Sequence, residues 1–303
     1  MAYRGASDPA PGRNAVRDPG RPLSLIVIGH VGWATDQTTT GSTVVVGGSG
    51  YAAAAAAASL ADGGVGLVAQ VGADLDPAVL RGAGLDLAGV EVLPGPSARF
   101  RIQQFPDGTR SFESELGVAS SLRTDLFPVP YLHARHIHLG TAPPRQQLSW
   151  LKFLRDKGST AKISVDMFEH FVKHEPMDSR AACDMADLIF LNKVEYDGLY
   201  QAHEYPKPAV VLKYGAGGAE LIRDGMKHRV PAETVDEIDP IGAGEILAGV
   251  FLALHARGLS EERALHHAVD VATRSVTEFG VDGPQRTQAL TRIKAEVAAT
   301  SRA

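Results

Sequence analysis

The chain has 303 residues, a formal net charge of −5 at pH 7 and 44% hydrophobic residues. This size and composition favour one large α/β domain, or a domain with a small appendage, and the slight acidity argues against nucleic acid as the main partner. The single cysteine, Cys183, excludes an internal disulfide and a cysteine-based zinc site, and no apolar run approaches the ~20 residues of a membrane span.

Residues 1–22 are rich in Pro, Gly, Arg and Asp and contain no apolar segment. This composition predicts a disordered tail and not a signal peptide, so we expect residues 23–303 to form the folded domain. A lone cysteine is typical of a cytoplasmic protein, which is the location we expect.

The first apolar run, 23–29, predicts a buried strand that ends in glycine. A polar stretch from His30 to Asp36 follows it, and open α/β sheets bind ligands in loops at the carboxyl ends of their strands. Asp36 is therefore a candidate hydrogen-bond acceptor for substrate hydroxyls, with a simple turn residue as the alternative.

Residues 37–46 are rich in Thr and Val and predict a strand. Gly47 and Gly48 then interrupt the chain, and an alanine-rich helix is predicted over 51–61. Because these two glycines have no side chains, a ligand or another backbone can come close to them.

A hairpin with one polar face is predicted farther along the chain. Residues 99–105 alternate polar with apolar side chains, residues 106–108 supply a turn, and residues 110–113 return. With the preceding Thr-rich strand, this hairpin predicts a small lid built from 37–46 and 98–115, which would exclude water from a site. A hairpin at the edge of the main sheet is the alternative.

From residue 136 onward, predicted strands and helices alternate. Strands are predicted at 136–140, 162–166, 188–191 and 209–213, with helices at 144–157 and 177–185. A short hairpin at 219–230 and three helices at 242–257, 260–279 and 285–300 complete the chain. This alternation implies an α/β fold with a mostly parallel sheet covered on both faces.

The stretch from Asp239 to Glu245 directly precedes an apolar helical run. Gly242, Ala243 and Gly244 leave the N–H groups of a helix N-terminus accessible, and the helix dipole adds partial positive charge, which suits a phosphate. Glu245 stands in the first helical turn, where a base can reach a group beside that phosphate. The alternative is an ordinary helix start with two glycines and an acidic residue.

Missing motifs exclude several classes of site. The chain contains no Gly-x-Ser-x-Gly elbow and no His-Glu-x-x-His, and no Walker A lysine follows the glycines. The first strand is not followed by the Gly-x-Gly-x-x-Gly turn of a dinucleotide site.

The order of these motifs resembles the ribokinase-like, or PfkB, family of sugar kinases over 23–280. The resemblance rests on separated elements in a fixed order: Gly29-His30-Val31, Gly47-Gly48, the hairpin with Gly108 and Arg110, Asn192-Lys193-Val194-Glu195, Lys213-Tyr214-Gly215 with Gly218, and Asp239 to Glu245. The style of these motifs is most similar to members that act on inositol-type polyols and sugars.

The resemblance implies a doubly wound, mostly parallel sheet flanked by helices, with a small β-sheet lid through which a homodimer can form. It also implies ATP-dependent phosphorylation, with Mg²⁺, of a hydroxyl group on a small sugar, polyol or cyclitol. A nucleoside kinase is an alternative, and so is a catalytically impaired relative that binds nucleotide or sugar in a regulatory role.

The resemblance also implies roles for single residues. Gly242, Ala243 and Gly244 would hold the transferring phosphoryl group while Glu245 accepts the proton of the acceptor hydroxyl. Residues facing the acceptor would be Asp36, Gly47, Gly48, Tyr51, Arg101 and Gln103. Residues along the nucleotide would be Asn192, Lys213, Gly215, Gly218 and Asp239, and residues organising Mg²⁺ would be Asn192 and Glu195. For this last pair, a helix N-cap with a capping box is the alternative.

Three positions depart from the family pattern. Glu245 stands where the family base is almost always aspartate, and the extra methylene moves the carboxylate by about an ångström, which can cost on the order of a hundredfold in rate. Ile241 replaces a usual threonine, and Ala52 stands where many members carry an asparagine that contacts substrate. These departures predict an unusual acceptor pocket.

Overall fold

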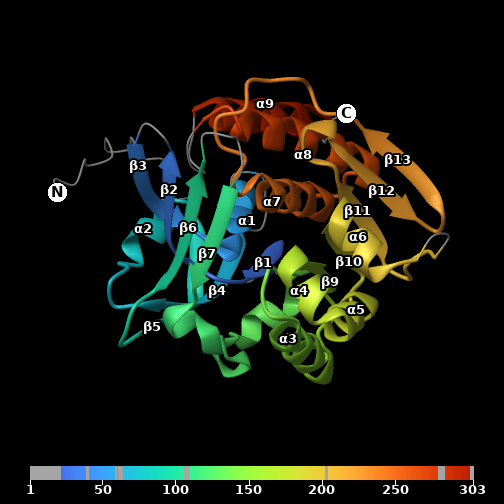
Figure 1. Cartoon of the computed structure of the whole chain (residues 1–303). Coiled ribbons are helices and arrows are strands. Elements are labelled where there is room, and N and C mark those ends of the chain that lie inside the picture. The colour runs from blue at the N-terminus through green and yellow to red at the C-terminus, as the bar shows by residue number, and fades with distance from the viewer. Residues whose placement is uncertain are drawn as a thin grey trace.

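The computed structural model describes residues 22–38, 41–58, 60, 64–105, 110–201, 204–278 and 284–300. Within these ranges the strands form one nine-stranded sheet, in the order β13-β12-β11-β10-β9-β8-β1-β4-β5, and one four-stranded sheet, in the order β3-β2-β6-β7 (Figure 1). The expected tail lies almost wholly outside the described residues. No helix in the described ranges is both long enough and apolar enough to cross a membrane.

The large sheet is built from short apolar runs. Its strands are β1 (Leu25–Ile28), β4 (Val65–Gly72), β5 (Leu85–Leu93), β8 (His136–Leu139), β9 (Lys162–Asp166), β10 (Leu188–Asn192), β11 (Ala209–Lys213), β12 (Ala219–Arg223) and β13 (Met226–Val230). The pairs from β5 to β11 are parallel, and only β12 and β13 pair antiparallel. The expected mostly parallel sheet is therefore confirmed.

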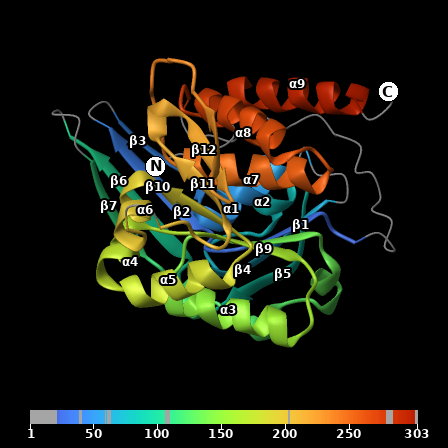
Figure 2. The same cartoon turned by 90° about the vertical axis from the view of Figure 1, so that its right-hand side faces the viewer.

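Helices cover both faces of this sheet, as Figure 2 shows. One face packs against α1 (Ser49–Ala58), α2 (Ala78–Arg81), α7 (Ala243–Ala256), α8 (Glu261–Ser275) and α9 (Pro284–Thr300). The other face packs against α3 (Pro144–Asp156), α4 (Glu169–His174), α5 (Pro176–Met185) and α6 (Lys193–Leu199). Because parallel strands are buried on both faces, they read in sequence as continuous apolar runs.

Helices α1 and α7 approach each other at backbone distance. A Cβ atom built on Gly249 of α7 would lie 2.1 Å from the carbonyl oxygen of Ala53 in α1. Helix α1 consists largely of alanine, and seven of its consecutive residues from Tyr51 to Ala57 are buried. Small side chains on both helices therefore permit this close crossing, since larger ones would hold the axes apart.

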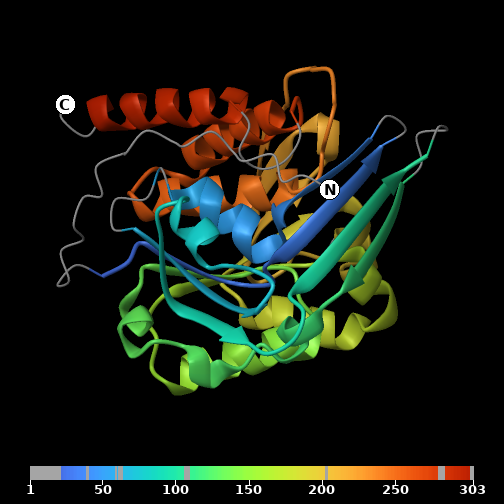
Figure 3. The ribbon, with the colours of Figure 1, turned by 90° about the vertical axis from the view of Figure 1, so that its left-hand side faces the viewer.

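The small sheet stands beside the large one (Figure 3) and consists of β2 (Gly32–Thr38), β3 (Gly41–Gly47), β6 (Ala98–Gln104) and β7 (Arg110–Glu115). The single strand predicted at 37–46 is wrong, because these residues fall on two antiparallel strands whose pairing runs from Gly32↔Gly47 to Thr38↔Gly41. The β-prone Thr and Val residues on either side of the reversal let both halves pair. The predicted hairpin turn at 106–108 lies outside the described residues.

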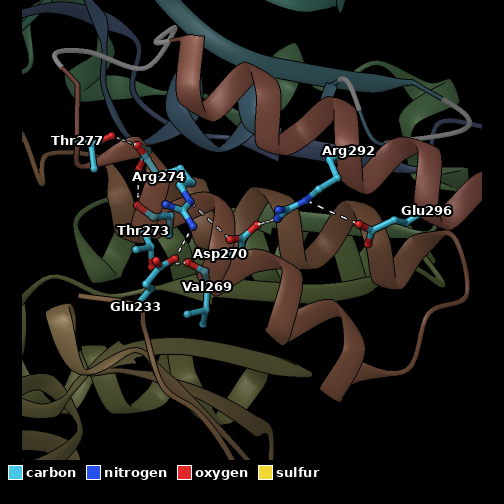
Figure 4. Close-up of polar contacts among 10 residues, drawn as sticks. Glu233, Val269, Asp270, Thr273, Arg274, Thr277, Arg292 and Glu296 are labelled. Carbon is cyan, nitrogen blue, oxygen red and sulfur yellow. Dashed lines mark hydrogen bonds and ion pairs between the residues drawn. The ribbon is translucent and has the colours of Figure 1, made fainter. Parts of the chain in front are cut away.

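Ion pairs connect α8 to its neighbours (Figure 4). Arg274 of α8 contacts Glu233, in the segment after β13, and lies 3.8 Å from Asp270 one turn earlier. Arg292 of α9 contacts the same Asp270 and lies 3.7 Å from Glu296. Because the contacts share side chains, they form a network that ties α9 and the segment before α7 to one helix.

Candidate active site

A cavity of about 310 Å³ lies between the two sheets, at the carboxyl ends of the parallel strands. Of the residues predicted from sequence to serve the site, seven line this cavity: Gly47, Gly48, Glu195, Lys213, Asp239, Gly242 and Glu245. Open α/β sheets bind ligands at this edge, and the volume matches the lower end of small-molecule sites.

The turn before α7 is rigid and exposes a helix N-terminus. Gly242 is the N-cap and has a φ of 76°, a left-handed conformation that favours glycine. The carboxylate of Asp239 accepts a hydrogen bond of 3.0 Å from the backbone N–H of Ile241, and the N–H of Asp239 donates to Val276 at 3.0 Å. The first N–H groups of an α-helix lack partners within the helix, so those at the start of α7 can receive an anion, and the N–H of Ala243 also donates to the Pro240 carbonyl at 3.3 Å.

Lys213 and Asp166 form a buried ion pair at the inner end of the cavity. The ammonium of Lys213 donates to Oδ1 of Asp166 at 2.7 Å, and Asp166 is fully buried. Oδ2 of Asp166 has no hydrogen-bond partner within the described part of the chain. A Cβ atom on Gly244 would lie 3.3 Å from Nζ of Lys213, so the ammonium lies against the N-terminal turn of α7.

Burial and charge shift the pKa values of this cluster. Burial raises the pKa of Asp166, an effect that Lys213 opposes and Glu245 reinforces. Burial lowers the pKa of Lys213, but the nearby carboxylates of Asp166, Glu195 and Glu245 outweigh it, so that this pKa lies above its ordinary value. Lys213 is therefore a cation at neutral pH, in a position where a phosphoryl group would be stabilised.

Asn192 and Glu195 form a complete capping box at the start of α6. The backbone N–H of Asn192 donates to Oε2 of Glu195 at 2.7 Å, and its side-chain amide donates to Oε1 at 2.9 Å. The N–H of Glu195 donates back to the Asn192 side chain at 2.8 Å. Burial raises the pKa of Glu195 to about 7, while Lys213 lowers it. The helix-cap interpretation is thus correct, yet Glu195 also faces the cavity.

A magnesium ion would have to be held here largely through water and phosphate oxygens. Among the described residues, no group of three or more His, Cys, Asp or Glu side chains could enclose a metal ion. Mg²⁺ commonly keeps several water ligands and is bound through one or two carboxylates and substrate phosphates. The carboxylates of Glu195 and Asp166 on the cavity wall suit that arrangement.

Glu245 is the carboxylate best placed to accept a proton. It stands in the first turn of α7, is partly buried and lines the cavity. Its side chain makes no hydrogen bond or ion pair with another residue of the described chain, whereas the carboxylates of Asp166 and Glu195 are both engaged.

The rest of the cavity lining is mostly apolar and partly aromatic, and Ser49, Ser114 and Thr141 are polar residues within it. Its walls include Ala34, Val45, Val46, Ala52, Phe100, Leu116, Ala142, Pro143, Met167, Phe168, Phe171 and Ile241. Ala52 and Ile241, the two departures from the family pattern, both line the cavity and present apolar side chains to it. Two of its aromatic residues, Phe168 and Phe171, were not predicted from sequence; they follow β9 and lie around the start of α4.

His30 supplies a further polar group to this lining. It is 4% exposed, and its Nε2 atom has no hydrogen-bond partner in the described chain. Burial lowers the pKa of His30 to about 4, although Gln146 raises it, so the ring is neutral at pH 7. Gly48 makes room beside it, because a Cβ atom there would lie 2.5 Å from the His30 carbonyl oxygen.

Several residues predicted to bind substrate do not line the cavity. Tyr51 belongs to α1 and is buried in the core, and Arg101 is exposed and forms an ion pair with Glu113 at 3.0 Å. Gln103 is also exposed. Asp36 lies in β2 and not in the predicted loop, and its side chain is outside the described part of the structure.

The residues predicted to bind the nucleotide lie at or just beyond the carboxyl-end edge of the large sheet. Asn192 and Lys213 are paired neighbours at the ends of β10 and β11. Gly215 and Gly218 lie in the turn after β11, beyond the cavity lining, and a Cβ atom on Gly218 would lie 2.1 Å from the carbonyl oxygen of Val230. Ala243 and Gly244 belong to the start of α7 beside the cavity and are not part of its lining.

Comparisons with known proteins agree with this geometry. The family model described as pfkB family carbohydrate kinase matches residues 28–288. A cytidine kinase of Thermococcus kodakarensis is 29% identical over 273 residues, which cover 85% of this chain and 98% of that protein. An ATP-dependent ribose-1-phosphate kinase of Halopiger xanaduensis is 26% identical over 215 residues, covering 67% of this chain and 71% of that protein.

Solved structures share the fold. The adenosine kinase of Sinorhizobium meliloti superimposes with a TM-score of 0.77 at 17% identity, over 89% of this chain and 99% of that chain. The large parallel sheet with a small separate sheet is therefore the ribokinase-like arrangement that the motif order predicted.

Proposed function

Because the chain belongs to the pfkB family of carbohydrate kinases and is a phosphotransferase, we propose that it transfers the terminal phosphoryl group of ATP to a hydroxyl of a nucleoside. The observation that carries this choice of acceptor is the mostly apolar, partly aromatic lining of the cavity that also contains the Lys213–Asp166 pair.

A nucleoside matches this wall better than a bare sugar does. A sugar or cyclitol presents hydroxyl groups on nearly every carbon and needs a matching set of polar side chains, because an unpaired buried hydroxyl is costly. A nucleobase instead offers a flat face that stacks on aromatic rings such as Phe100, Phe168 and Phe171. The cytidine kinase that this chain matches over nearly its whole length supports the same class of acceptor.

The chemistry assigned to the site is an in-line displacement. The acceptor hydroxyl oxygen forms a bond to the γ-phosphorus while the bond from that phosphorus to the ADP oxygen breaks, and the hydroxyl proton passes to Glu245. The N–H groups of Gly242, Ala243 and Gly244 and the ammonium of Lys213 stabilise the charge on the transferring group. Glu195 and Asn192 would hold Mg²⁺ through water, and the ion would neutralise charge on the phosphates of ATP.

His30 positions the acceptor in this proposal. Its buried, unpartnered Nε2 atom supplies one hydrogen bond at a mostly apolar wall, where Ser49, Ser114 and Thr141 are the other polar side chains. Bound ATP would extend from its γ-phosphate at the α7 turn toward Gly215 and Gly218, along the ends of β10 and β11. Asp239 maintains the phosphate turn through its bond to Ile241.

Glu245 also raises the competing possibility that catalysis is impaired. The experiment that decides it measures Mg²⁺-dependent ATP consumption by the wild type, Glu245→Gln and Glu245→Asp. The acceptors tested are cytidine, adenosine and inosine beside ribose, fructose and myo-inositol. We expect the wild type to phosphorylate a nucleoside and Glu245→Gln to lose about 10²- to 10⁴-fold in rate, the usual contribution of a general base.

Other outcomes would reject defined parts of the proposal. Turnover with sugars or cyclitols alone would retain the kinase and overturn the nucleoside acceptor. Activity in Glu245→Asp, with the wild type and Glu245→Gln both silent, would show that the native chain has lost the chemistry. If none of the three proteins consumes ATP with any acceptor and none binds ATP measurably, the role of ATP is rejected.

A further inference from the structure

A second cavity, of about 330 Å³, lies at the opposite edge of the large sheet from the catalytic cavity. The catalytic cavity borders the carboxyl ends of the strands, at Asp166 and Lys213. The second cavity borders their amino ends, where His136 and Lys162 are the first residues of β8 and β9. The carboxyl end of α7 and the amino end of α8 contribute His255 and Glu261.

Basic side chains outnumber the acidic ones that can neutralise them at this cavity. Its lining includes Lys162, Lys207 and Arg223, with Asp187 and Glu261 as the carboxylates. Arg223 binds Glu261 through two hydrogen bonds, one of them 2.7 Å long.

The second carboxylate is also occupied. Asp187 pairs with Arg155 at 2.8 Å and accepts a backbone hydrogen bond of 2.7 Å from Ile163. Neither Lys162 nor Lys207 has a carboxylate partner within the described chain. Two positive charges are thus left at a concave surface of a protein whose net charge is −5.

Two histidines supply hydrogen-bonding groups between these charges. His136 and His255 lie with ring centroids 5.2 Å apart, and His136 is 6% exposed. The ring nitrogens of His136 have no hydrogen bond to any described residue, whereas His255 contacts Lys162 through Nε2 at 3.4 Å.

The charge state of His136 reports the same local field. Burial, together with His255, Lys162 and Arg135, lowers the pKa of His136 to about 3, and Asp187 opposes this shift. The guanidinium of Arg135 is held beside the site by a 2.6 Å hydrogen bond to the Ala256 carbonyl. The neutral imidazole keeps one N–H donor, which an anion can accept.

We propose that this cavity binds a small anion, a phosphate or a carboxylate on a short carbon frame, between Lys162, Lys207 and His136. Both lysines are exposed at the rim, so their chains can close on a ligand without rearrangement of the sheet. The apolar wall formed by Ile163, Leu188 and Ala209 suits the carbon frame. Nothing in this argument depends on the acceptor of the catalytic site.

The test follows the histidine signals of the full-length protein by NMR. His136 and His255 are assigned with His136→Asn and His255→Asn, and the protein is titrated with inorganic phosphate and with citrate at an ionic strength matched with sodium chloride. We expect one or both anions to shift the His136 signal in a saturable manner. The signal reports this cavity alone, so phosphate bound at the catalytic site does not interfere.

A double variant tests the named lysines. The double variant Lys162→Gln with Lys207→Gln is expected to bind the anion about tenfold or more weakly, because two charge-assisted contacts are lost. The control Lys152→Gln replaces an exposed lysine of α3 and leaves the affinity unchanged. A shift with phosphate alone identifies a phosphate site, and a shift with citrate alone identifies a carboxylate site. No shift with either anion, an equal shift with chloride, or unchanged affinity in the double variant would overturn the proposal.

Discussion

The Nζ atom of Lys213 lies 2.7 Å from Oδ1 of Asp166, although the two residues end strands that are separated by β10. The pair is buried at the point where the cavity meets the α7 turn. This contact holds the Lys213 ammonium in a fixed position beside the α7 turn, which supplies a side-chain cation that a glycine turn alone does not have.

The first prediction concerns catalysis by that charge. Lys213→Met removes the ammonium while retaining most of the side-chain volume, so we expect kcat to fall by about 10²- to 10³-fold, as for loss of one transition-state donor. Steady-state kinetics measure kcat with the acceptor that the ATP-consumption assay identifies. Lys152→Met on the surface of α3 is the matched control. A change of kcat no larger than that of the control would assign Lys213 a structural role only.

The second prediction concerns stability of the same pair. Lys213→Met leaves Asp166 buried without its counter-charge, and breaking a buried pair costs about 3–5 kcal/mol of unfolding free energy. Adding Asp166→Asn removes the uncompensated charge, so the double variant should be more stable than Lys213→Met. Urea unfolding of the two single variants and the double variant measures the coupling. Additive effects would contradict a direct interaction.

The third prediction concerns pH. The pKa of Glu195 is raised to about 7, so below pH 7 its side chain is protonated and cannot act as a carboxylate toward a hydrated magnesium ion. We therefore expect kcat/KM to rise with pH through about 7. Glu195→Gln should lower the activity and remove this limb of the profile. If the limb persists in Glu195→Gln, another group controls it.

The fourth prediction concerns the aromatic wall. Phe168→Ala should raise KM for a nucleoside by about 5- to 150-fold, corresponding to a stacking energy of ~1–3 kcal/mol, with a smaller effect on kcat. Phe105→Ala, at an exposed site outside the cavity lining, is the control. Equal KM values for the two variants would remove Phe168 from the acceptor site.

The fifth prediction concerns the helix crossing. Gly249→Ala forces a methyl group against the Ala53 carbonyl, and we expect it to lower the free energy of unfolding by about 1–3 kcal/mol, as for overpacking. Gly82→Ala is the matched control, because its φ is −56° and its nearest atom would be 3.5 Å away. Thermal unfolding should show no loss of stability in the control.

Much of the fold could be predicted from local sequence. The apolar runs of the parallel strands are buried on both faces, so their positions are readable without knowledge of their partners. The glycine turn before α7 was also recognisable, because it combines small residues with an immediate helix. The single strand predicted at 37–46 failed because pairing partners, and not composition, decide where a β-prone stretch reverses.

The acceptor wall was harder to predict. Side chains alternate along a strand, so Phe100, which lines the cavity, directs Arg99 and Arg101 to the other face of β6. The prediction that Arg101 and Gln103 face the acceptor selected the polar face of the hairpin, whereas the cavity uses the apolar face. That alternation was visible in the sequence, but which face meets the large sheet was not.

Contacts across long sequence separations could not be read at all. Asp166 and Lys213 are 47 positions apart and meet only through the strand order. His30 likewise gains its role from burial beside Gly48, and a lone histidine in a sequence carries no such signal. The homodimer through the small sheet and the cytoplasmic location stay predictions.

The crossing of α1 and α7 also fixes the geometry of the reaction. Helix α1 starts directly after Gly47 and Gly48, and α7 starts at Gly242, so the N-termini of both helices face the catalytic cavity. The contact of Gly249 with Ala53 sets the separation between the acceptor and phosphate sides in this structure. The additional methylene of Glu245, about an ångström, must therefore be matched by an acceptor hydroxyl that sits farther from α7 than an aspartate would require.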